Sequence, residues 1–156
     1  MSRIASKLAE LGIVLPTPAA PVANYVPYVQ SGRLLIISGQ LCLGPDGRIA
    51  DSYKGKVGAE VSLEAGQAAA RLCGINLLAQ VHAALGDLDR VRRVVRLGGF
   101  INSAPDFGAV PGVMNGASDL MVEIFGDLGR HARSTVGVAQ LPLDAAVEVE
   151  GMFEVA

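Results

Sequence analysis

The sequence is poor in aromatic residues and in positive charge, which argues against a nucleic-acid-binding surface. Aromatic side chains make up 4% of the 156 residues, tryptophan is absent, and the formal net charge at pH 7 is −2. Proteins that bind nucleic acids present basic patches to the phosphates and aromatic rings to unpaired bases. Since neither is abundant, we expect no nucleic-acid partner.

Cysteine and histidine are also scarce, and their spacing matches no metal site. Cys42 and Cys73 each lie within an apolar run, where a cysteine usually serves as a small apolar side chain. We place His82 late in a helix and His131 on a loop surface. The sequence also lacks a P-loop, a G-x-G-x-x-G turn and a G-x-S-x-G nucleophile motif. We therefore predict neither a metal nor a cofactor.

No uninterrupted apolar run reaches the ~20 residues that span a bilayer, and the N-terminal residues are amphipathic, unlike a signal peptide. With few cysteines, these features predict a cytoplasmic protein without a membrane partner. Hydrophobic residues make up 51% of the chain, enough for one domain with a sizeable core. We treat residues 1–156 as a single domain, in which residues 1–20 form an N-terminal helix and a proline-rich arm.

The hydrophobic pattern predicts an α+β fold. Ser2 is expected to cap a short helix over residues 3–11, and Ser62 and Gly86 to bound a long helix over residues 63–85. Gly116 should weaken a second main helix that ends near Gly126. Strands are expected near residues 34–43, 91–101, 134–141 and 145–155, the first too continuously apolar for a sheet face open to water. Both main helices can then cover one face of the sheet.

The last predicted strand alternates between apolar and acidic residues. Val147, Val149, Phe153 and Val155 share one face, whereas Glu148, Glu150, Met152 and Glu154 share the other. In the strand near residue 95, alternation places Arg92, Val94 and Arg96 opposite Val91, Arg93, Val95 and Leu97. If Arg92 and Arg96 lie on the acidic face, that face is a subunit contact or a cleft, or simply a face open to water.

Arg133 and Glu148 are the residues that carry possible chemistry. Arg133 lies where a loop enters a strand, and its planar guanidinium suits a carboxylate, although an arginine at such a position is more often a surface salt-bridge partner. Glu148 follows fifteen positions later, across a short turn that could bring the two strands together. It either forms a structural ion pair or holds a water for proton transfer. Spacing alone leaves both alternatives open.

Three segments together resemble the RidA (YjgF) family. They are PYVQSGRLLIISGQLCL, the alanine-rich helix and, above all, ARSTVGVAQLPLDAAVEVE. The resemblance spans roughly residues 21–155, and the extended N-terminus and the loop near residue 105 indicate a divergent branch. It implies a chorismate-mutase-like fold, a mixed six-stranded sheet with two main helices packed on one face. It also implies a homotrimer with ligand clefts between the subunits.

The resemblance further implies an activity and a set of site residues. Archetypal members of the family hydrolyse reactive enamines and imines of amino-acid metabolism to 2-keto acids and ammonia. Arg133 would hold the substrate carboxylate and Glu148 the attacking water. The remaining cleft residues would be Tyr28, Ser38, Gly39, Asn115 and Thr135, the last replacing a cysteine that is common in the family.

Two other functions fit the resemblance. The chain could be a non-catalytic binder of small carboxylates such as 2-keto acids, in which Arg133 acts without a productive water. Endoribonuclease activity is associated with some relatives, but the charge of this chain disfavours it. Replacing Glu148 by glutamine should abolish turnover in a deaminase and leave the affinity of a simple binder largely intact.

Overall fold

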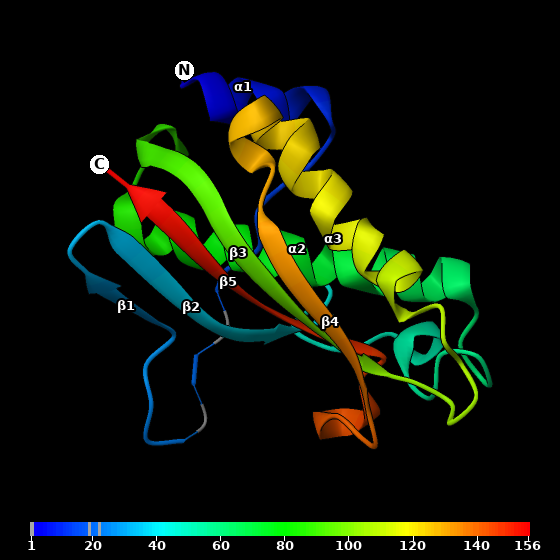
Figure 1. Cartoon of the computed structure of the whole chain (residues 1–156). Coiled ribbons are helices and arrows are strands. Elements are labelled where there is room, and N and C mark those ends of the chain that lie inside the picture. Colours follow the sequence, from blue (N-terminus) through cyan, green and yellow to red (C-terminus); the bar gives the residue numbers. More distant parts are fainter. Residues whose placement is uncertain (1, 19, 22) are drawn as a thin grey trace.

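The computed structural model describes residues 2–18, 20–21 and 23–156. Its strands form one mixed sheet in the order β1-β2-β5-β3-β4 (Figure 1), in which β3 and β4 are parallel and the other neighbours antiparallel. The strands are β1 Tyr28–Ser31, β2 Leu34–Leu41, β3 Val91–Asn102, β4 Ala132–Val138 and β5 Val147–Val155, and the α-helices are α1 Arg3–Glu10, α2 Leu63–Leu85 and α3 Val110–Phe125. Short 3-10 turns are η1 Asp51–Tyr53, η2 Leu88–Arg90, η3 Gly126–Gly129 and η4 Pro142–Asp144.

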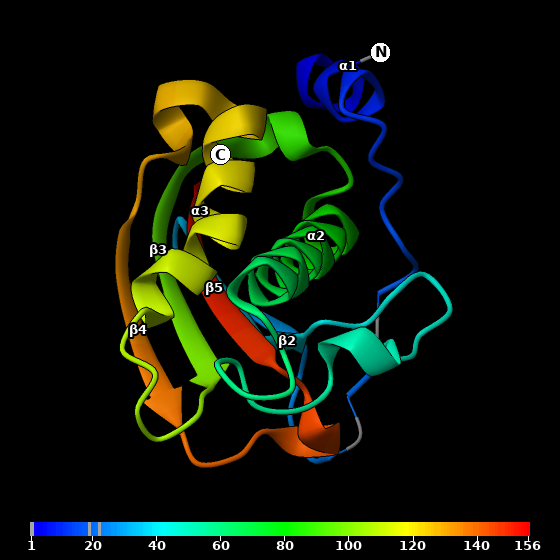
Figure 2. The same cartoon turned by 90° about the vertical axis from the view of Figure 1, so that its right-hand side faces the viewer.

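The described residues form a sheet of five strands, where the family resemblance implied six. The segment between β2 and α2 contributes only isolated bridges, such as Lys54 with Ala145 and Val57 with Ser103, so it adds no further strand to the described sheet. The α+β class and the chorismate-mutase-like architecture are otherwise as predicted. Figure 2 shows that α2 and α3 cover the same face of the sheet, also as predicted.

The helix ends follow the capping residues of the sequence. The Ser2 hydroxyl accepts a hydrogen bond from the Ala5 amide, and the Ser62 hydroxyl accepts one from the Ala65 amide, each 3.1 Å long. Gly86 ends α2 at φ +77°, a conformation that glycine adopts without strain. These three predictions are confirmed, with α1 one residue shorter than expected.

Helix α2 lies in the core. It is long and apolar enough to cross a membrane by length and composition alone, but 56% of its most apolar window is buried inside the protein. Cys73, Leu77 and Leu78 are among its fully buried residues. Cys42 is buried as well, and both cysteines are free thiols. The apolar character of α2 therefore matches its packing, since α2 contacts both the sheet and the neighbouring helix α3.

Gly116 has a different role from the one expected. It lies where α3 crosses α2, and a side-chain carbon at this position would overlap the backbone carbonyl of Gln67. At another crossing point of the same helices, a side-chain carbon at Gly74 would lie 2.8 Å from Leu120. The glycine does cost helix propensity, but it allows the two helix backbones to approach closely.

Strand β5 alternates as predicted, whereas β3 does not. Register shifts lie between Val91 and Arg93 and between Val94 and Arg96 of β3, where it pairs with β5. Because each bulge moves the following side chains to the other face, Val91, Val94 and Leu97 all point into the core. Strict alternation had placed Val94 on the opposite face from Val91 and Leu97.

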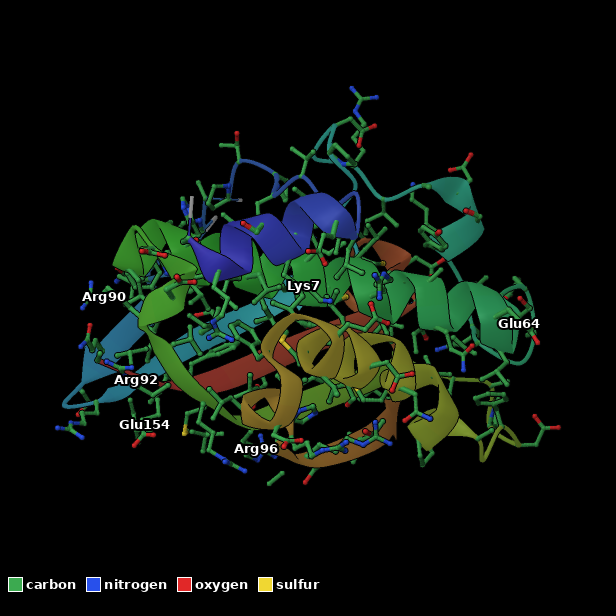
Figure 3. The ribbon with its side chains drawn as sticks, turned by 90° about the horizontal axis from the view of Figure 1, so that it is seen from above. Lys7, Glu64, Arg90, Arg92, Arg96 and Glu154 are labelled. Atoms are coloured by element: carbon green, nitrogen blue, oxygen red, sulfur yellow. The ribbon has the colours of Figure 1, made fainter. Side chains whose placement is uncertain are left out.

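The sheet face away from the helices carries both charged and apolar side chains. Arg96 and Glu150 form an ion pair of 3.5 Å, and Figure 3 shows Arg92, Arg96 and Glu154 along the side of the sheet that faces away from α2. On the same face Leu34 and Ile36 are 37% and 41% exposed. The expectation that both faces of β2 are covered is therefore wrong for the single chain, since the helices cover only one face.

Candidate active site

Glu148 lies at the wall of a pocket of about 450 Å³ that several segments share. Strand β2 bulges between Ile37 and Gln40, and this irregularity brings Ser38 and Gly39 beside the start of β5. The pocket is lined by Ala20, Pro21, Tyr25, Pro27, Ser38, Gly39, Gln40, Leu41, Leu43, Gly47, Gln80, Pro142, Leu143 and Glu148. Three residues predicted for the site, Ser38, Gly39 and Glu148, are thus brought together.

The Glu148 carboxylate is half-buried and carries an altered pKa. Burial raises the pKa of this carboxyl above its ordinary value, and the nearby negative charge of Glu150 raises it further. The carboxylate lies directly against Gly39, where a side-chain carbon would overlap it. A carboxylate held beside a pocket with a raised pKa is suited to accept a proton from water near neutral pH.

The turn η4 forms part of the pocket wall, and no pattern in the sequence predicted its shape. Leu143 and Asp144 adopt φ values of +59° and +58°, which are uncommon for residues other than glycine. Buried Asn102 fixes this segment because its side-chain amide donates to the Ala145 carbonyl over 3.1 Å and to Gln140 Oε1 over 2.9 Å. Leu143, 70% exposed, is left at the rim of the pocket.

Arg133 lies on edge strand β4 and points toward the helices. It pairs with Leu97 of β3, whose side chain is fully buried under them. Its Nη1 donates to Ser118 Oγ over 3.0 Å, and its Nη2 donates to the Pro111 carbonyl over 3.1 Å. Both acceptors belong to α3, so the guanidinium is held in the groove between β4 and this helix.

Two other predicted site residues lie near Arg133. Thr135 follows it by two positions on β4, and Thr135 Oγ1 is the one buried side-chain nitrogen or oxygen in the described part of the chain without a hydrogen-bond partner. Buried polar atoms are nearly always paired, so a lone hydroxyl favours a site for a ligand or water. Asn115 is exposed on α3, on the helix face that also carries Pro111 and Ser118.

His131 was predicted on a loop surface, but it is half-buried between β4 and α3. Its Nε2 lies 2.9 Å from Ser118 Oγ and its Nδ1 lies 2.6 Å from the Gly129 carbonyl. Burial lowers the pKa of the imidazole, and the positive charge of Arg133 lowers it further. Sequence reasoning missed this network, although the R-H-A-R spacing placed both side chains on the same parity.

A single chain keeps Arg133 and Glu148 apart. Strands β4 and β5 are not neighbours, because β3 lies between them and pairs with both. Glu148 pairs with Phe100 and faces away from the helices, whereas Arg133 pairs with Leu97 and faces them. The expectation that the short turn brings these two strands together is therefore wrong: the chain crosses the end of β3 instead.

Tyr28 lies near the Glu148 pocket without lining it. It pairs with Ile37 on β2, and the two side chains share the face covered by the helices, where Tyr28 packs against the core. Tyr25, three residues earlier and 52% exposed, lines the pocket instead. Within the described residues, no group of three histidine, cysteine, aspartate or glutamate side chains is placed to hold a metal ion.

Comparison with known sequences identifies relatives that span nearly the whole chain. The family model described as "YjgF/chorismate_mutase-like, putative endoribonuclease" matches residues 5–154. Protein TCP17 of Trypanosoma cruzi is 52% identical over 153 residues, covering 97% of this chain and 94% of that protein. The 2-iminobutanoate/2-iminopropanoate deaminase of Dermatophagoides farinae is 32% identical over 141 residues, covering 89% of this chain and 93% of that enzyme.

Solved structures show the same architecture. A crystal structure of a protein of unknown function from Agrobacterium tumefaciens superposes with a TM-score of 0.91 at 47% identity, covering 99% of this chain and 93% of that one. The YjgF protein of Escherichia coli superposes with a TM-score of 0.64 at 25% identity, covering 90% of this chain and 97% of that one.

Proposed function

Because the chain belongs to the YjgF (RidA) family, we propose that it hydrolyses reactive imines or enamines bearing a carboxylate, in a cleft between two copies of the chain. One observation supports the proposal: the predicted site residues lie in two separate groups on one chain. One contains Ser38, Gly39 and Glu148, and the other contains Arg133 and Thr135. The relative named as an imine deaminase supports the reaction class.

The arrangement of the sheet favours a shared cleft. Arg133 lies on β4 at one edge of the sheet (Figure 1) and faces the helices, whereas Glu148 lies on β5 and faces away from them, so we expect the two side chains to share a cleft only when copies associate. The sheet face without helices carries exposed apolar side chains that a second copy would cover, among them Val29 (51% exposed) and Val136 (47%). We propose a homotrimer, in which three such contacts close a ring.

The chemistry needs few groups. Arg133 would bind the substrate carboxylate and hold the C=N carbon near Glu148. Glu148 would accept a proton from a water as its oxygen bonds to that carbon, and would return this proton to the nitrogen, giving a neutral carbinolamine. The same carboxylate would then take the hydroxyl proton of the carbinolamine and deliver it to the nitrogen as the C–N bond breaks and the C=O bond forms, releasing ammonia and a 2-keto acid. One imine and one water are consumed in each turnover, and no electrons are exchanged with another reagent.

The second candidate is a binder of small carboxylates that performs no chemistry. Arg133 and the unpaired Thr135 hydroxyl favour it as much as they favour an enzyme, because both can bind a ligand without an activated water. The two functions differ in what they require of Glu148. Glu148→Gln retains the shape of the side chain but removes its capacity to accept a proton.

The test is imine hydrolysis in the presence of semicarbazide, with imines generated in situ by a threonine dehydratase and by an amino-acid oxidase. We expect a native rate above background that falls about a hundredfold or more in Arg133→Ala and in Glu148→Gln. Arg71→Ala serves as the matched control, because it removes an arginine of α2 that pairs with Glu123 of α3 over 3.2 Å, away from the open sheet face. Absence of acceleration with every imine, together with 2-keto acid binding that needs Arg133, would favour the binder. A monomer by light scattering would overturn the shared cleft.

A further inference from the structure

Hydrogen bonds connect His131 to the guanidinium of Arg133 through one hydroxyl. A carbonyl oxygen can only accept, so the contact of 2.6 Å between His131 Nδ1 and the Gly129 carbonyl assigns a proton to Nδ1. In a neutral imidazole, Nε2 is then an acceptor, and the Ser118 hydroxyl 2.9 Å away donates to it. The tautomer of His131 is therefore set by the backbone of η3.

The same hydroxyl also accepts a hydrogen bond from Arg133. Ser118 Oγ lies 3.0 Å from Arg133 Nη1, and the Pro111 carbonyl lies 3.1 Å from Nη2. These bonds use two of the five N–H donors of the guanidinium. The remaining N–H donors can bind a carboxylate. The two acceptors on α3 fix the plane of the guanidinium and therefore the direction in which these donors point.

Building on the proposed function, we propose that His131 is a positioning residue for Arg133 whose protonation is coupled to carboxylate binding. The neutral imidazole orients the Ser118 hydroxyl, which holds the guanidinium. The imidazolium adds a second positive charge behind the guanidinium. Ser118 keeps its bond to Arg133 in both states, because a hydroxyl oxygen can accept two hydrogen bonds.

The charges around His131 determine the direction of the coupling. Arg133 on β4 is one of them, and Asp119 beside Ser118 on α3 is another. Asp127 and Arg130 form an ion pair of 3.3 Å, and Arg93 on β3 donates a hydrogen bond to the Arg130 carbonyl. Arg133 is the charge that lowers the pKa of the imidazole, after the larger effect of burial.

A bound carboxylate neutralises Arg133 and so removes part of the repulsion felt by an imidazolium. Carboxylate binding therefore raises the pKa of His131 and draws a proton from solvent. By reciprocity, protonation of His131 strengthens carboxylate binding by the same factor. Affinity should consequently increase as the pH falls through the pKa of the imidazole, even though the ligand carboxylate stays ionised.

The experiment is calorimetric titration of the full chain with 2-oxobutanoate, at several values from about pH 5 to 8, in two buffers of different ionisation enthalpy. Their difference in heat gives the number of protons taken up. The test variant is His131→Gln. His82→Gln is its matched control, because His82 is the other histidine and is exposed on α2. Glu148→Gln is included because a second carboxyl of raised pKa in the same cleft could also take up a proton.

We expect binding to tighten roughly fivefold toward low pH, with uptake of a fraction of a proton. Both effects should persist in His82→Gln and Glu148→Gln and disappear in His131→Gln. Arg133-dependent binding without proton uptake, or with uptake that survives in His131→Gln, would overturn the coupling and leave the proposed function standing. Absence of any Arg133-dependent binding would overturn both.

Ser118→Ala tests the positioning role separately. Loss of the Ser118 hydroxyl removes the acceptor of Arg133 Nη1. We therefore expect the affinity for 2-oxobutanoate to fall about fivefold or more, while the circular dichroism spectrum stays unchanged. Ser118→Thr, which keeps the hydroxyl, should recover most of the affinity. Equal affinity of Ser118→Ala and the native chain would overturn the role of the hydroxyl.

Discussion

The carboxylate of Glu148 lies directly against the α-carbon of Gly39, so closely that no side-chain carbon fits at position 39. The contact joins β5 to the bulge of β2, where the register shifts between Ile37 and Gln40. The bulge and the missing side chain together make room for a half-buried carboxylate beside the pocket. Gly39 therefore acts on the position of the carboxylate that we assign to water activation.

Gly39→Ala should displace Glu148 and lower imine hydrolysis about a hundredfold, because a shift of about 1 Å at a reacting group can cost that much. Gly108→Ala is the matched control, since no atom of the described residues lies within 4 Å of a side-chain carbon built at Gly108. Both rates are measured by semicarbazide competition. Native activity in Gly39→Ala would contradict the assignment of Glu148 as the group that holds the water.

Glu150→Gln should extend activity to lower pH. The negative charge of Glu150 helps to raise the pKa of Glu148, so its removal lowers that pKa toward the ordinary value while the effect of burial remains. Glu148 must be ionised to accept a proton, and the acid limb of the kcat/KM profile should therefore move to lower pH. Glu154→Gln, on the same face of β5, should leave the limb in place. A shift of the limb toward higher pH in Glu150→Gln would be inconsistent with the proposed role of Glu148.

Local patterns in the sequence predicted the caps of α1 and α2 and the faces of β5. Serine caps and a terminal glycine act within one helical turn, and side-chain alternation acts within one strand, so both can be read without the rest of the fold. Val147 and Val149 are fully buried as alternation required, and Ser62 caps α2 as expected.

Features that depend on contacts between distant segments were not predictable in the same way. The bulges of β3 arise in its pairing with β5, and they reversed the expected face of Val94. The insertion of β3 between β4 and β5 separated Arg133 from Glu148, although a short turn joins their strands. The burial of His131 depends on Ser118 of α3, thirteen positions away.

The close approach of α2 and α3 provides a prediction for stability. Gly116→Ala places a carbon against the Gln67 backbone carbonyl, which cannot rotate away, so we expect a loss of about 3 kcal/mol in the free energy of unfolding. Among the described residues, a side-chain carbon at Gly112 of the same helix would meet only Leu63, at an ordinary 3.6 Å, so Gly112→Ala should stabilise the helix by up to about 1 kcal/mol. Urea denaturation of both variants measures the difference. Equal stability of the two would show that α3 shifts freely over α2.

The docking of α1 provides a prediction for pH dependence. The Asp89 carboxylate accepts hydrogen bonds from the amides of Arg3 (2.9 Å) and Ile4 (2.8 Å), the first N–H groups of α1. These bonds, chiefly the one from Ile4, lower the pKa of Asp89. A carboxyl whose pKa is lowered by folding contributes stability above its ordinary pKa, and this contribution is lost as the pH falls through the lower value of the folded state.

We therefore expect Asp89→Asn to release α1 at neutral pH without unfolding the domain. Hydrogen exchange followed by mass spectrometry should show faster exchange over residues 3–10, by roughly two- to tenfold, and unchanged protection of α2. Asp51→Asn is the control, because Asp51 is fully exposed and, among the described residues, forms an ion pair with nearby Lys54 alone, over 3.8 Å. Exchange in α1 equal to that of the native chain would mean that Ile4 and Leu8, which are buried against the domain, hold the helix without Asp89. Faster exchange in α2 as well would mean that α1 and the core unfold as one unit.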